Sequence, residues 1–531
     1  MTADVILLGK VFTADPARPW AQGVAVRAGT ITSIGTREEV LQHRTPRTEV
    51  IDAAGLISPA FHDAHIHLLE GSLFDLWVNL HDVAPGDYEP AIAAAANTLP
   101  PDAWVRGGGW NMSAFPGASP SHTTLDAVVG GRPAYLTARD GHSAWVSSAA
   151  LRIAGIDATT PDPAGGVIDR DAGGNPSGTV HETAMNLVKR HLPEITGDEW
   201  AGALRIGERH LHSLGVVSWQ DARLSTPMLR AYVEAEAAGT LSSRVVAAMH
   251  WDPDRGVEQV AGLLEARELA GGPLVQATMV KIFVDGVVEN LTAALHEPYS
   301  CAHSHGKALF DDAALRAAVR TCAEAGFSVH VHSIGDAATT SALDAFEAAH
   351  HLSDGLRHQI CHLQVIRESD IPRFHQLGVI ANAQALWACR DEQNVALCQP
   401  ALGTARFERQ YPFGDLARAG ARLAFGSDWR VSTPNPLPQM EVAITRRPPG
   451  DTTTGPLGPS QALDLQTCLL GFTREAAYAA GLDAVTGALT VGRAADIVVL
   501  DSDVFGLPPH ELSSAQVDLT MFAGKVVYTR A

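Results

Sequence analysis

The sequence predicts an α/β protein built on a (β/α)8, TIM-like barrel, with a small β-sandwich formed by both chain ends and a large insertion after barrel strand 1. Three observations support this prediction. Apolar strand-like runs alternate with helical stretches through the middle of the chain, which is typical of a parallel sheet. Both ends contain only short strands and turns. One connection is far longer than a normal loop, so it must hold a substructure of its own.

Eight apolar runs account for the barrel. The first is Leu56–His67, and helical stretches such as Asp312–Ala325 and Ala337–Ala349 separate later ones. We expect the other seven strands at Gly215–Ala222, Arg244–Met249, Met279–Gly286, Phe327–Ile334, His358–Leu363, Val379–Gln384 and Leu423–Ser427. An open, doubly wound sheet is the alternative, although no GxGxxG turn opens the first helix.

The two chain ends share one pattern of short strands. These are Asp4–Leu8, Gly23–Arg27, Thr30–Gly35, Ala495–Asp501 and Leu519–Tyr528. Because chain ends commonly lie close together, we expect residues 1–57 and 484–531 to form the β-sandwich and residues 58–483 to form the barrel. The insertion, at about residues 72–205, should lie over the carboxyl ends of the strands, where barrel sites form.

Composition limits the partners. The net charge of −20, from 39 basic and 59 acidic residues, disfavours nucleic acid as a partner. No run approaches the 18 apolar residues of a membrane span. The six cysteines are scattered and form no CxxC pair, which favours a reducing, cytoplasmic location. The C-terminal strands could support a homodimer, but nothing in the sequence decides this.

Histidines at strand ends provide the first candidate site. His65 and His67 close the first strand, where residues two apart face the same side, so both could bind one metal ion. Two inward histidines that neighbours satisfy are the alternative. Three further His-x-His pairs lie on an expected helix, in a polar loop and at the end of strand 5: His210/His212, His303/His305 and His330/His332.

A lysine interrupts the fourth strand. An unpaired charge on Lys281, inside the run Met279–Asp285, would cost several kcal/mol in a buried parallel sheet. Burial lowers the pKa of a lysine and leaves a nucleophilic amine, which can react with CO2 to give a carbamate. Such a carbamate is an anionic oxygen ligand that can bridge two metal ions. An ion pair with a carboxylate such as Asp285 is the alternative.

Polar residues also end three later strands. His332 ends strand 5, His362 ends strand 6 and Asp428 ends strand 8. Each alone could be a hydrogen-bonded core residue or, for Asp428, a helix N-cap. Together with His65, His67 and Lys281 they place six polar residues at the ends of strands 1, 4, 5, 6 and 8. This recurrence predicts a metal-binding cluster.

This ordered set resembles the amidohydrolase superfamily. Narrower motifs surround it and are similar to amidohydrolase family 3, the branch that contains N-substituted formamide deformylases. They include Asp140-Gly-His-Ser-Ala-Trp-Val, Gly165-Gly-Val-Ile, Asn175-Pro-Ser-Gly-Thr, Val280-Lys-Ile-Phe-Val-Asp-Gly-Val, His332-Ser-Ile-Gly-Asp-Ala and Gly426-Ser-Asp-Trp. The resemblance spans nearly the whole chain. One departure is Ala60, where the family usually has glycine.

The resemblance implies a role for each candidate. His65, His67, Asp428 and a carbamylated Lys281 would hold a first metal ion, and the carbamate, His332 and His362 a second. A hydroxide between the ions would be the nucleophile, and Asp428 would accept its proton and pass it to the leaving amine. We expect one or two divalent transition-metal ions per chain. Zn2+ is the first choice, and the ligands also suit Mn2+, Fe2+ and Co2+.

The insertion supplies the candidate substrate contacts. The resemblance implies that His142 and Trp145 contact substrate. Further substrate candidates are Trp110, Asn111, Arg139 and Glu182 in the insertion, with packing and loop bonding as their alternatives, and Asp285 after Lys281. Aromatic side chains here would favour an apolar or aromatic amide substituent.

The expected activity is hydrolysis of an amide C–N bond in a small molecule, with an N-substituted formamide as one candidate substrate. A deaminase or cyclic-amide hydrolase on the same barrel is the alternative, although Lys281 argues against the mononuclear deaminase pattern. A catalytically inactive scaffold and a metal carrier are the non-enzymatic alternatives. All six candidate ligands are present, which disfavours the scaffold.

Overall fold

The computed structural model describes residues 2–81, 83–139, 141, 143–163 and 166–530. The chain divides into two compact units, one spanning Met1–His67 and Glu208–Ala531 and the other spanning Leu68–Gly207. Helix α7 (Gly197–Ser213) leads from the second unit back into the first. Within the described ranges, no helix has the length and apolar character needed to cross a membrane.

Eight parallel strands form the central sheet of the first unit. In spatial order they are β18 (Leu423–Phe425), β17 (Ile380–Ala383), β16 (Gln359–His362), β15 (Ser328–Ser333), β14 (Val275–Phe283), β13 (Arg244–His250), β12 (Val216–Leu224) and β5 (Phe61–Ile66). The first and last strands meet where the backbone N–H of Asp428 donates to the His65 carbonyl at 2.7 Å. The predicted barrel of eight parallel strands is therefore confirmed.

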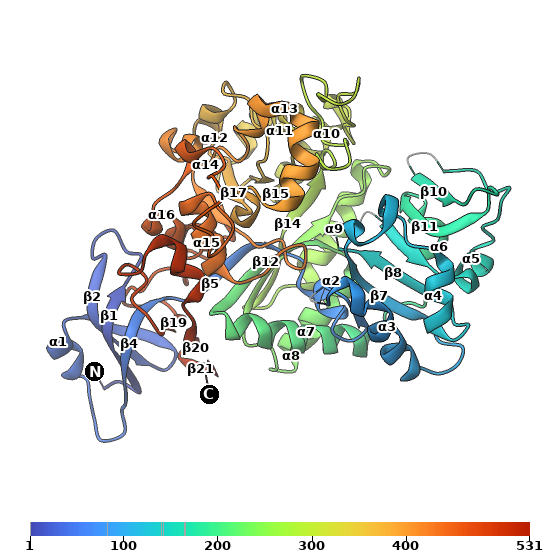
Figure 1. The fold of residues 1–531 in the computed structure, drawn as a ribbon. Helices are drawn as coiled ribbons and strands as arrows, with labels where there is room; N and C mark the ends of the chain where they lie inside the picture. Colours follow the sequence, from blue (N-terminus) through green and yellow to red (C-terminus); the bar gives the residue numbers. More distant parts are fainter. Residues whose placement is uncertain (1, 82, 140, 142, 164–165, 531) are drawn as a thin grey trace. The chain divides into compact units, whose positions relative to one another are not determined.

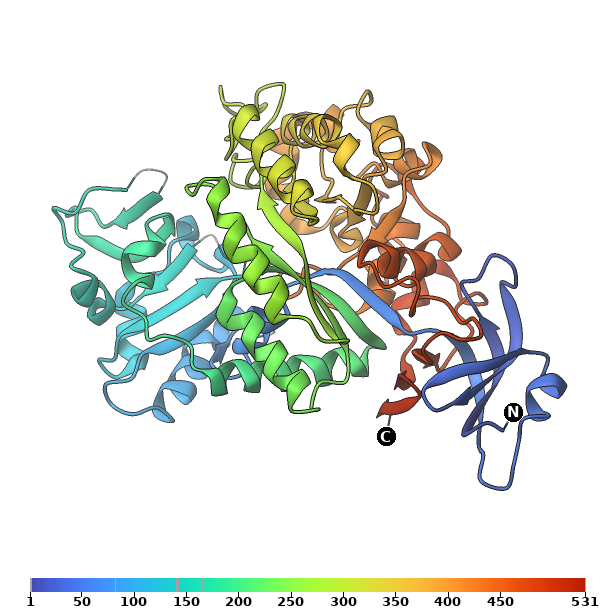
Figure 2. The ribbon, with the colours of Figure 1, turned by 180° about the vertical axis from the view of Figure 1, so that it is seen from behind.

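Helices follow most of the barrel strands, and Figure 2 shows them in green to orange outside the strands. Helix α10 illustrates why they form: Asp311 caps its first turn by accepting from the Ala314 N–H at 2.8 Å. Its buried face repeats at helical spacing through Leu315, Val319 and Cys322. The helices are α8 (Thr226–Ala237), α9 (Val260–Leu269), α10 (Asp312–Glu324), α11 (Asp336–Ala348), α12 (Ile371–Leu377), α13 (Gln399–Phe407), α14 (Phe413–Arg418), α15 (Pro436–Thr445), α16 (Leu465–Gly471) and α17 (Arg474–Ala479).

Strands from both chain ends pair in one seven-stranded sheet, seen in blue and red in Figure 1. Their order is β21 (Lys525–Thr529), β20 (Val517–Phe522), β19 (Ile497–Leu500), β4 (Glu49–Pro59), β1 (Val5–Phe12), β2 (Trp20–Arg27) and β3 (Thr30–Gly35). Antiparallel pairing of β19 with β4 joins the two ends. The short helix α1 (Arg37–Leu41) follows β3. The boundaries expected at residues 57/58 and 483/484 stay predictions.

The segment Leu56–His67 was expected to be one strand, and this expectation is wrong. Its first part belongs to β4 of the terminal sheet, and β5 of the barrel begins only at Phe61. Pro59 has no N–H to continue a ladder, and the Ala60 N–H donates to the Asp496 carbonyl instead. The chain therefore changes sheets at this point.

The second unit contains its own six-stranded mixed sheet. The strands lie in the order β10 (Gly166–Arg170), β11 (Pro176–Glu182), β9 (Ser143–Val146), β8 (Ala134–Ala138), β7 (Val105–Trp110) and β6 (Val78–Asn79). Its helices are α2 (Leu68–Leu73), α3 (Tyr88–Asn97), α4 (His122–Val129), α5 (Ser148–Ala154) and α6 (Met185–Lys189). Trp110 and Trp145 are fully buried in the hydrophobic core of this unit.

Candidate metal centre

The end of the first barrel strand contributes two histidines. Every residue of β5 is buried, and His65 and His67 follow Asp63 at the two-residue spacing that keeps side chains on one face. The Asp63 carboxylate accepts from the backbone N–H groups of His65, at 3.0 Å, and Ser427, at 2.9 Å. Asp63 therefore ties the end of β5 to the segment that leads into Asp428.

Lys281 lies inside the barrel on β14 and is fully buried. Its Nζ donates to the Cys361 Sγ on β16 at 3.1 Å, and that thiol donates to the Val331 carbonyl at 3.1 Å. Burial lowers the pKa of the Lys281 amine. Among the described contacts, no ion pair links Lys281 to Asp285, the partner that the sequence left open.

Two histidines of β15 point into the barrel. His332 is nearly buried, and its Nε2 lies 3.3 Å from the Gly286 carbonyl oxygen and 3.8 Å from Asp285 Oδ1. His330, two residues earlier, is fully buried, and its Nε2 lies 2.8 Å from Nδ1 of His65. His330 was not predicted as a site residue, although its position two residues before His332 was the available signal.

His362 and Asp428 share an uncommon backbone conformation. Their φ angles are +76° and +52°, in the left-handed region that non-glycine residues rarely adopt. At His362 this conformation breaks the alternation of β16, so Cys361 and His362 both make contacts inside the barrel. Backbone strain of this kind is common where a side chain must be aimed at a functional site.

The predicted ligands converge at the carboxyl ends of the strands. Asp428 Oδ1 lies 3.4 Å from His65 Nε2 and 3.1 Å from His67 Nε2. The His362 ring centroid lies 5.0 Å from that of His65 and 4.4 Å from that of His332. The structure thus brings together all five histidine and aspartate candidates, with Lys281 on the same inner face.

Burial and neighbouring charges together set the protonation states of this cluster. Burial, aided by the nearby Lys281 amine, lowers the pKa of His65 and of His332 to about 3. The pKa of His362 falls well below its usual value for the same reason, with His332 adding to it. Burial raises the pKa of Asp428, but the adjacent His65 and His67 outweigh it and hold the pKa well below the usual range. Neutral imidazoles and an ionised carboxylate are the forms that bind metal ions.

One group of these atoms is arranged as expected for ligands of a metal ion. His65, His362 and Asp428 each offer one ligand atom, and these atoms lie within 4.8 Å of one another. Among the described residues, the buried His362 Nδ1 has no hydrogen-bond partner, and the buried His65 Nε2 and Asp428 Oδ1 have none beyond the ion-pair contacts that join Asp428 to His65 and His67. Buried polar atoms are rarely left unsatisfied, so this donor set fits a bound cation.

Two aromatic side chains flank the cluster, and the sequence analysis missed both as site residues. The Phe283 ring lies 5.0 Å from the His332 ring, and Trp387 stacks on the His362 ring at 5.4 Å with an interplanar angle of 16°. Both are partly exposed. Phe283 is the last residue of β14, and Trp387 follows β17 in the barrel unit.

The insertion candidates have other surroundings in their own unit. The indole N–H groups of Trp110 and Trp145 donate to backbone carbonyls at 2.8 and 2.9 Å, in line with a packing role. Asn111 caps a short turn by accepting from the Ser113 N–H at 3.1 Å. Glu182 ends β11, with a φ of +50°. Their substrate contacts stay predictions, as does that of Arg139, and His142 lies outside the described residues.

Asp285 accepts three backbone hydrogen bonds. They come from the Ala294, Ile334 and Gly335 N–H groups, at 2.9, 3.0 and 2.8 Å. Burial raises the pKa of Asp285 to about 7, although these bonds oppose the rise. The residue therefore joins the loops that follow β14 and β15, and its predicted contact with substrate stays untested.

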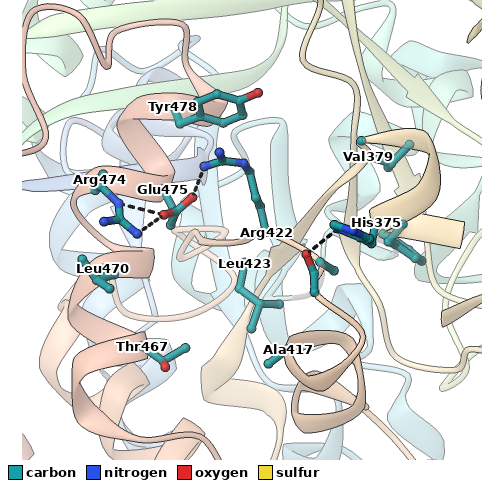
Figure 3. Close-up of a pocket in the computed structure, with 14 residues that line it drawn as sticks. His375, Val379, Ala417, Arg422, Leu423, Thr467, Leu470, Arg474, Glu475 and Tyr478 are labelled. Carbon is teal, nitrogen blue, oxygen red and sulfur yellow. Dashed lines mark hydrogen bonds and ion pairs between the residues drawn. The ribbon is translucent and has the colours of Figure 1, made fainter. Parts of the chain in front are cut away.

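A cleft of about 630 Å³ opens at the amino ends of β17 and β18, away from the candidate ligands. Figure 3 shows Glu475 between two arginines, with Oε2 2.7 Å from Arg422 Nη1 and Oε1 2.8 Å from Arg474 Nη2. In barrels of this type the amino face serves stability and the carboxyl face carries chemistry. The candidate site is therefore the histidine cluster and not this cleft.

Known proteins are similar to this chain over nearly its whole length. Protein LONG AFTER FAR-RED 3 of Arabidopsis thaliana is 30% identical over 556 residues, which cover 99% of this chain and 92% of that protein. An N-substituted formamide deformylase of Arthrobacter pascens is 27% identical over 557 residues, which cover 99% of this chain and 98% of that protein.

A solved structure shares the fold. The crystal structure of an uncharacterized metal-dependent hydrolase from Pyrococcus horikoshii superposes with a TM-score of 0.77 at 23% identity, covering 95% of this chain and 99% of that one. The model of the amidohydrolase family matches residues 49–528, which confirms the resemblance predicted from the motifs. The chain belongs to the amidohydrolase family and is a metal-dependent hydrolase that acts on carbon–nitrogen bonds.

Proposed function

We propose that this enzyme hydrolyses the C–N bond of a small amide, with N-substituted formamides as the leading substrate class. One observation carries the proposal: three buried ligand-type atoms, on His65, His362 and Asp428, converge within 4.8 Å of one another at the carboxyl face of the barrel and have no hydrogen-bond partner beyond the contacts of Asp428 with His65 and His67. Sites of barrel enzymes form at that face.

The cluster would hold one or two divalent metal ions, with Zn2+ as the first candidate. His65, His67 and Asp428 would form one side of the site, and His332 and His362 the other. When bound, the metal would polarise the scissile carbonyl and lower the pKa of water at the site. The depressed pKa values of the histidines support this assignment, because a neutral imidazole keeps its lone pair for a ligand bond.

Lys281 would carry a carbamate formed with CO2. Its amine is fully buried, and burial lowers its pKa, which shifts the amine towards its uncharged and nucleophilic form. The carbamate would add anionic oxygen ligands to those of the histidines and Asp428. Its negative charge would also offset the positive charge of the bound cations.

Asp428 would move the proton. Its carboxylate is ionised, since its pKa lies well below the usual range. It would accept a proton from the attacking water and deliver it to the amine that leaves, so one residue would serve both steps. The hydrogen bond from its backbone N–H to His65 supports this role, because it fixes the carboxylate beside the ligand atoms.

The substrate would carry an apolar or aromatic substituent. Phe283 and Trp387 support this proposal, because each ring is partly exposed beside a candidate ligand. The named activity of the Arthrobacter pascens relative makes N-substituted formamides the first substrates to test.

All six cysteines are free thiols, which supports a reducing, cytoplasmic location. The homodimer and the absence of nucleic-acid partners stay predictions. The presence of every candidate ligand in one cluster argues against an inactive scaffold.

Formate release tests the proposal. Full-length protein supplied with Zn2+ and bicarbonate should release formate from N-benzyl formamide, and a chelator or Lys281→Ala should abolish the release. If the enzyme hydrolysed N-benzyl acetamide but not N-benzyl formamide, the proposed amide hydrolysis would stand. Formamides would then be ruled out as the substrate class. Ammonia release from an aminated ring, with no amide cleaved, would favour the deaminase alternative.

A further inference from the structure

His330 contacts a candidate metal ligand but is not one itself. Its Nε2 lies 2.8 Å from Nδ1 of His65, and both side chains are fully buried. The two rings meet edge to face, with centroids 4.8 Å apart. The two residues come from β15 and β5, so the contact crosses the interior of the barrel.

The hydrogen bonds around His330 distinguish two groups of ligand-type atoms. His65, His330 and Cys361 form one group by proximity, and His65, His362 and Asp428 form the other. In the first group the atoms facing one another are already bonded: His330 to His65, Lys281 to Cys361 and Cys361 to a backbone carbonyl. In the second group the facing atoms have no hydrogen-bond partner among the described residues beyond the contacts of Asp428 with His65 and His67. The second group is therefore the candidate metal site, and the residues of the first group hold its ligands in place.

Proton accounting gives His330 a specific task. A neutral imidazole carries one proton, and a ring nitrogen that binds a metal ion must present its lone pair. If Nε2 of His65 binds the ion, the proton of that ring must be on Nδ1. The atom within hydrogen-bond distance of that Nδ1 is Nε2 of His330. With His330 Nε2 as acceptor, this buried N–H is satisfied at the metal ligand, and the proton of the neutral His330 ring then lies on its Nδ1, which is buried without a hydrogen-bond partner among the described residues.

We infer that His330 is a positioning residue, which accepts the Nδ1 proton of His65 and so holds the His65 ring in the tautomer and orientation that bind metal. The inference rests on the proposed metal site. It assigns His330 no contact with metal or substrate. Partners of this kind commonly change metal affinity 10- to 100-fold.

Two variants at this position separate positioning from packing. His330→Gln keeps an amide oxygen as acceptor near the place of Nε2, whereas His330→Leu fills the space without an acceptor. Zn2+ affinity of the metal-free, full-length chain is measured by competition with a chromogenic chelator. We expect His330→Leu to raise the Zn2+ Kd about 10- to 100-fold and His330→Gln to restore most of the affinity.

A matched control is His212→Gln. His212 is also buried, with Nε2 2.9 Å from Ser243 Oγ, and lies on α7 away from the ligands. This variant should bind Zn2+ as the wild type does. The Tm of each metal-free variant is measured in parallel, because a purely structural role would lower the Tm and leave the Kd unchanged.

The outcomes are distinguishable. In Zn2+-loaded wild-type protein, 15N spectra of labelled histidine should show a protonated Nδ1 on His65, assigned by its loss in His65→Ala. Wild-type affinity in His330→Leu, or a deprotonated Nδ1 on His65, would overturn the inference and leave the proposed function intact. A wild-type protein that binds no divalent metal would overturn both.

Discussion

The backbone N–H of Asp428 donates to the carbonyl oxygen of His65 at 2.7 Å, and the two side chains face each other with Nε2 and Oδ1 3.4 Å apart. One contact closes the barrel between its first and last strands, and the other forms the centre of the candidate metal site. Gly426 permits this approach, because a Cβ there would lie 2.4 Å from the His65 backbone nitrogen. Closure of the fold and assembly of the site therefore depend on the same few residues.

Strain at His362 predicts a trade-off between stability and metal binding. A non-glycine residue with left-handed φ costs about 1 kcal/mol, and asparagine tolerates this conformation better than most residues. We expect His362→Asn to leave the Tm of the metal-free protein unchanged or higher and to reduce kcat/KM about 100-fold or more. Calorimetry of the metal-free variant checks the first part. A large fall in its Tm would show that the His362 side chain supports the fold.

Lys281 predicts a dependence of activity on CO2. Protein dialysed against CO2-free buffer should lose activity and regain it with bicarbonate, because a carbamate on a buried amine forms reversibly. Lys281→Met removes the amine and keeps an apolar chain of similar length, so bicarbonate should not restore its activity. Native mass spectra of the wild type should show the added CO2. Full activity of wild-type protein in CO2-free buffer would contradict the carbamate.

Trp387 predicts substrate preference. Trp387→Ala should raise KM for N-benzyl formamide about 3- to 10-fold relative to N-methyl formamide, because aromatic contacts contribute about 0.5–1.5 kcal/mol. Trp387→Phe, which keeps a ring beside His362, should restore most of the preference. Steady-state kinetics with both substrates measure the ratio. An equal change in KM for both substrates would mean that Trp387 only orients His362.

Burial of His212, outside the candidate site, predicts that the stability of the fold decreases at acid pH. Burial lowers its pKa from the usual 6.5 to about 4 in the folded chain. Between these pH values His212 binds a proton in the unfolded chain but not in the folded chain. Its contribution to the free energy of unfolding is therefore fully present above pH 6.5 and is lost as the pH falls towards 4. The loss is about 3 kcal/mol at most. In metal-free protein, His212→Gln should show a shallower fall of Tm with pH than the wild type or the partly exposed control His510→Gln. Parallel curves would contradict this role.

Much of the barrel could be predicted because buried strands and helix faces appear in the sequence as apolar runs and apolar periodicity. The run Thr30–Gly35 matches β3, and Asp312–Ala325 matches α10 within one residue. The fourth barrel strand begins at Val275, four residues before the predicted start, because Gln276 and Thr278 interrupt the apolar run there. The boundary at Ala60 was missed because an apolar run continues across the change of sheet.

The site could be predicted only where its side chains follow the regular alternation of inward and outward residues along a strand. His65 and His67, two residues apart, could be placed on one face from spacing alone. Regular alternation would put His362 opposite Cys361, and only its left-handed φ brings both side chains inside. The pairing of His330 with His65 joins distant strands, so no local pattern encodes it. The tryptophans of the insertion carry no sign in the sequence of whether they line a surface or fill a core.

Elemental analysis of purified protein tests the central claim most directly. Wild-type chain should contain one to two equivalents of transition metal, and His65→Ala and Asp428→Asn should each lose most of it and reduce kcat/KM about 1000-fold. His303→Ala, at an exposed loop position, is the control and should retain both metal and activity. Stoichiometric metal in a His65→Ala/His67→Ala double variant would contradict the assignment of the site.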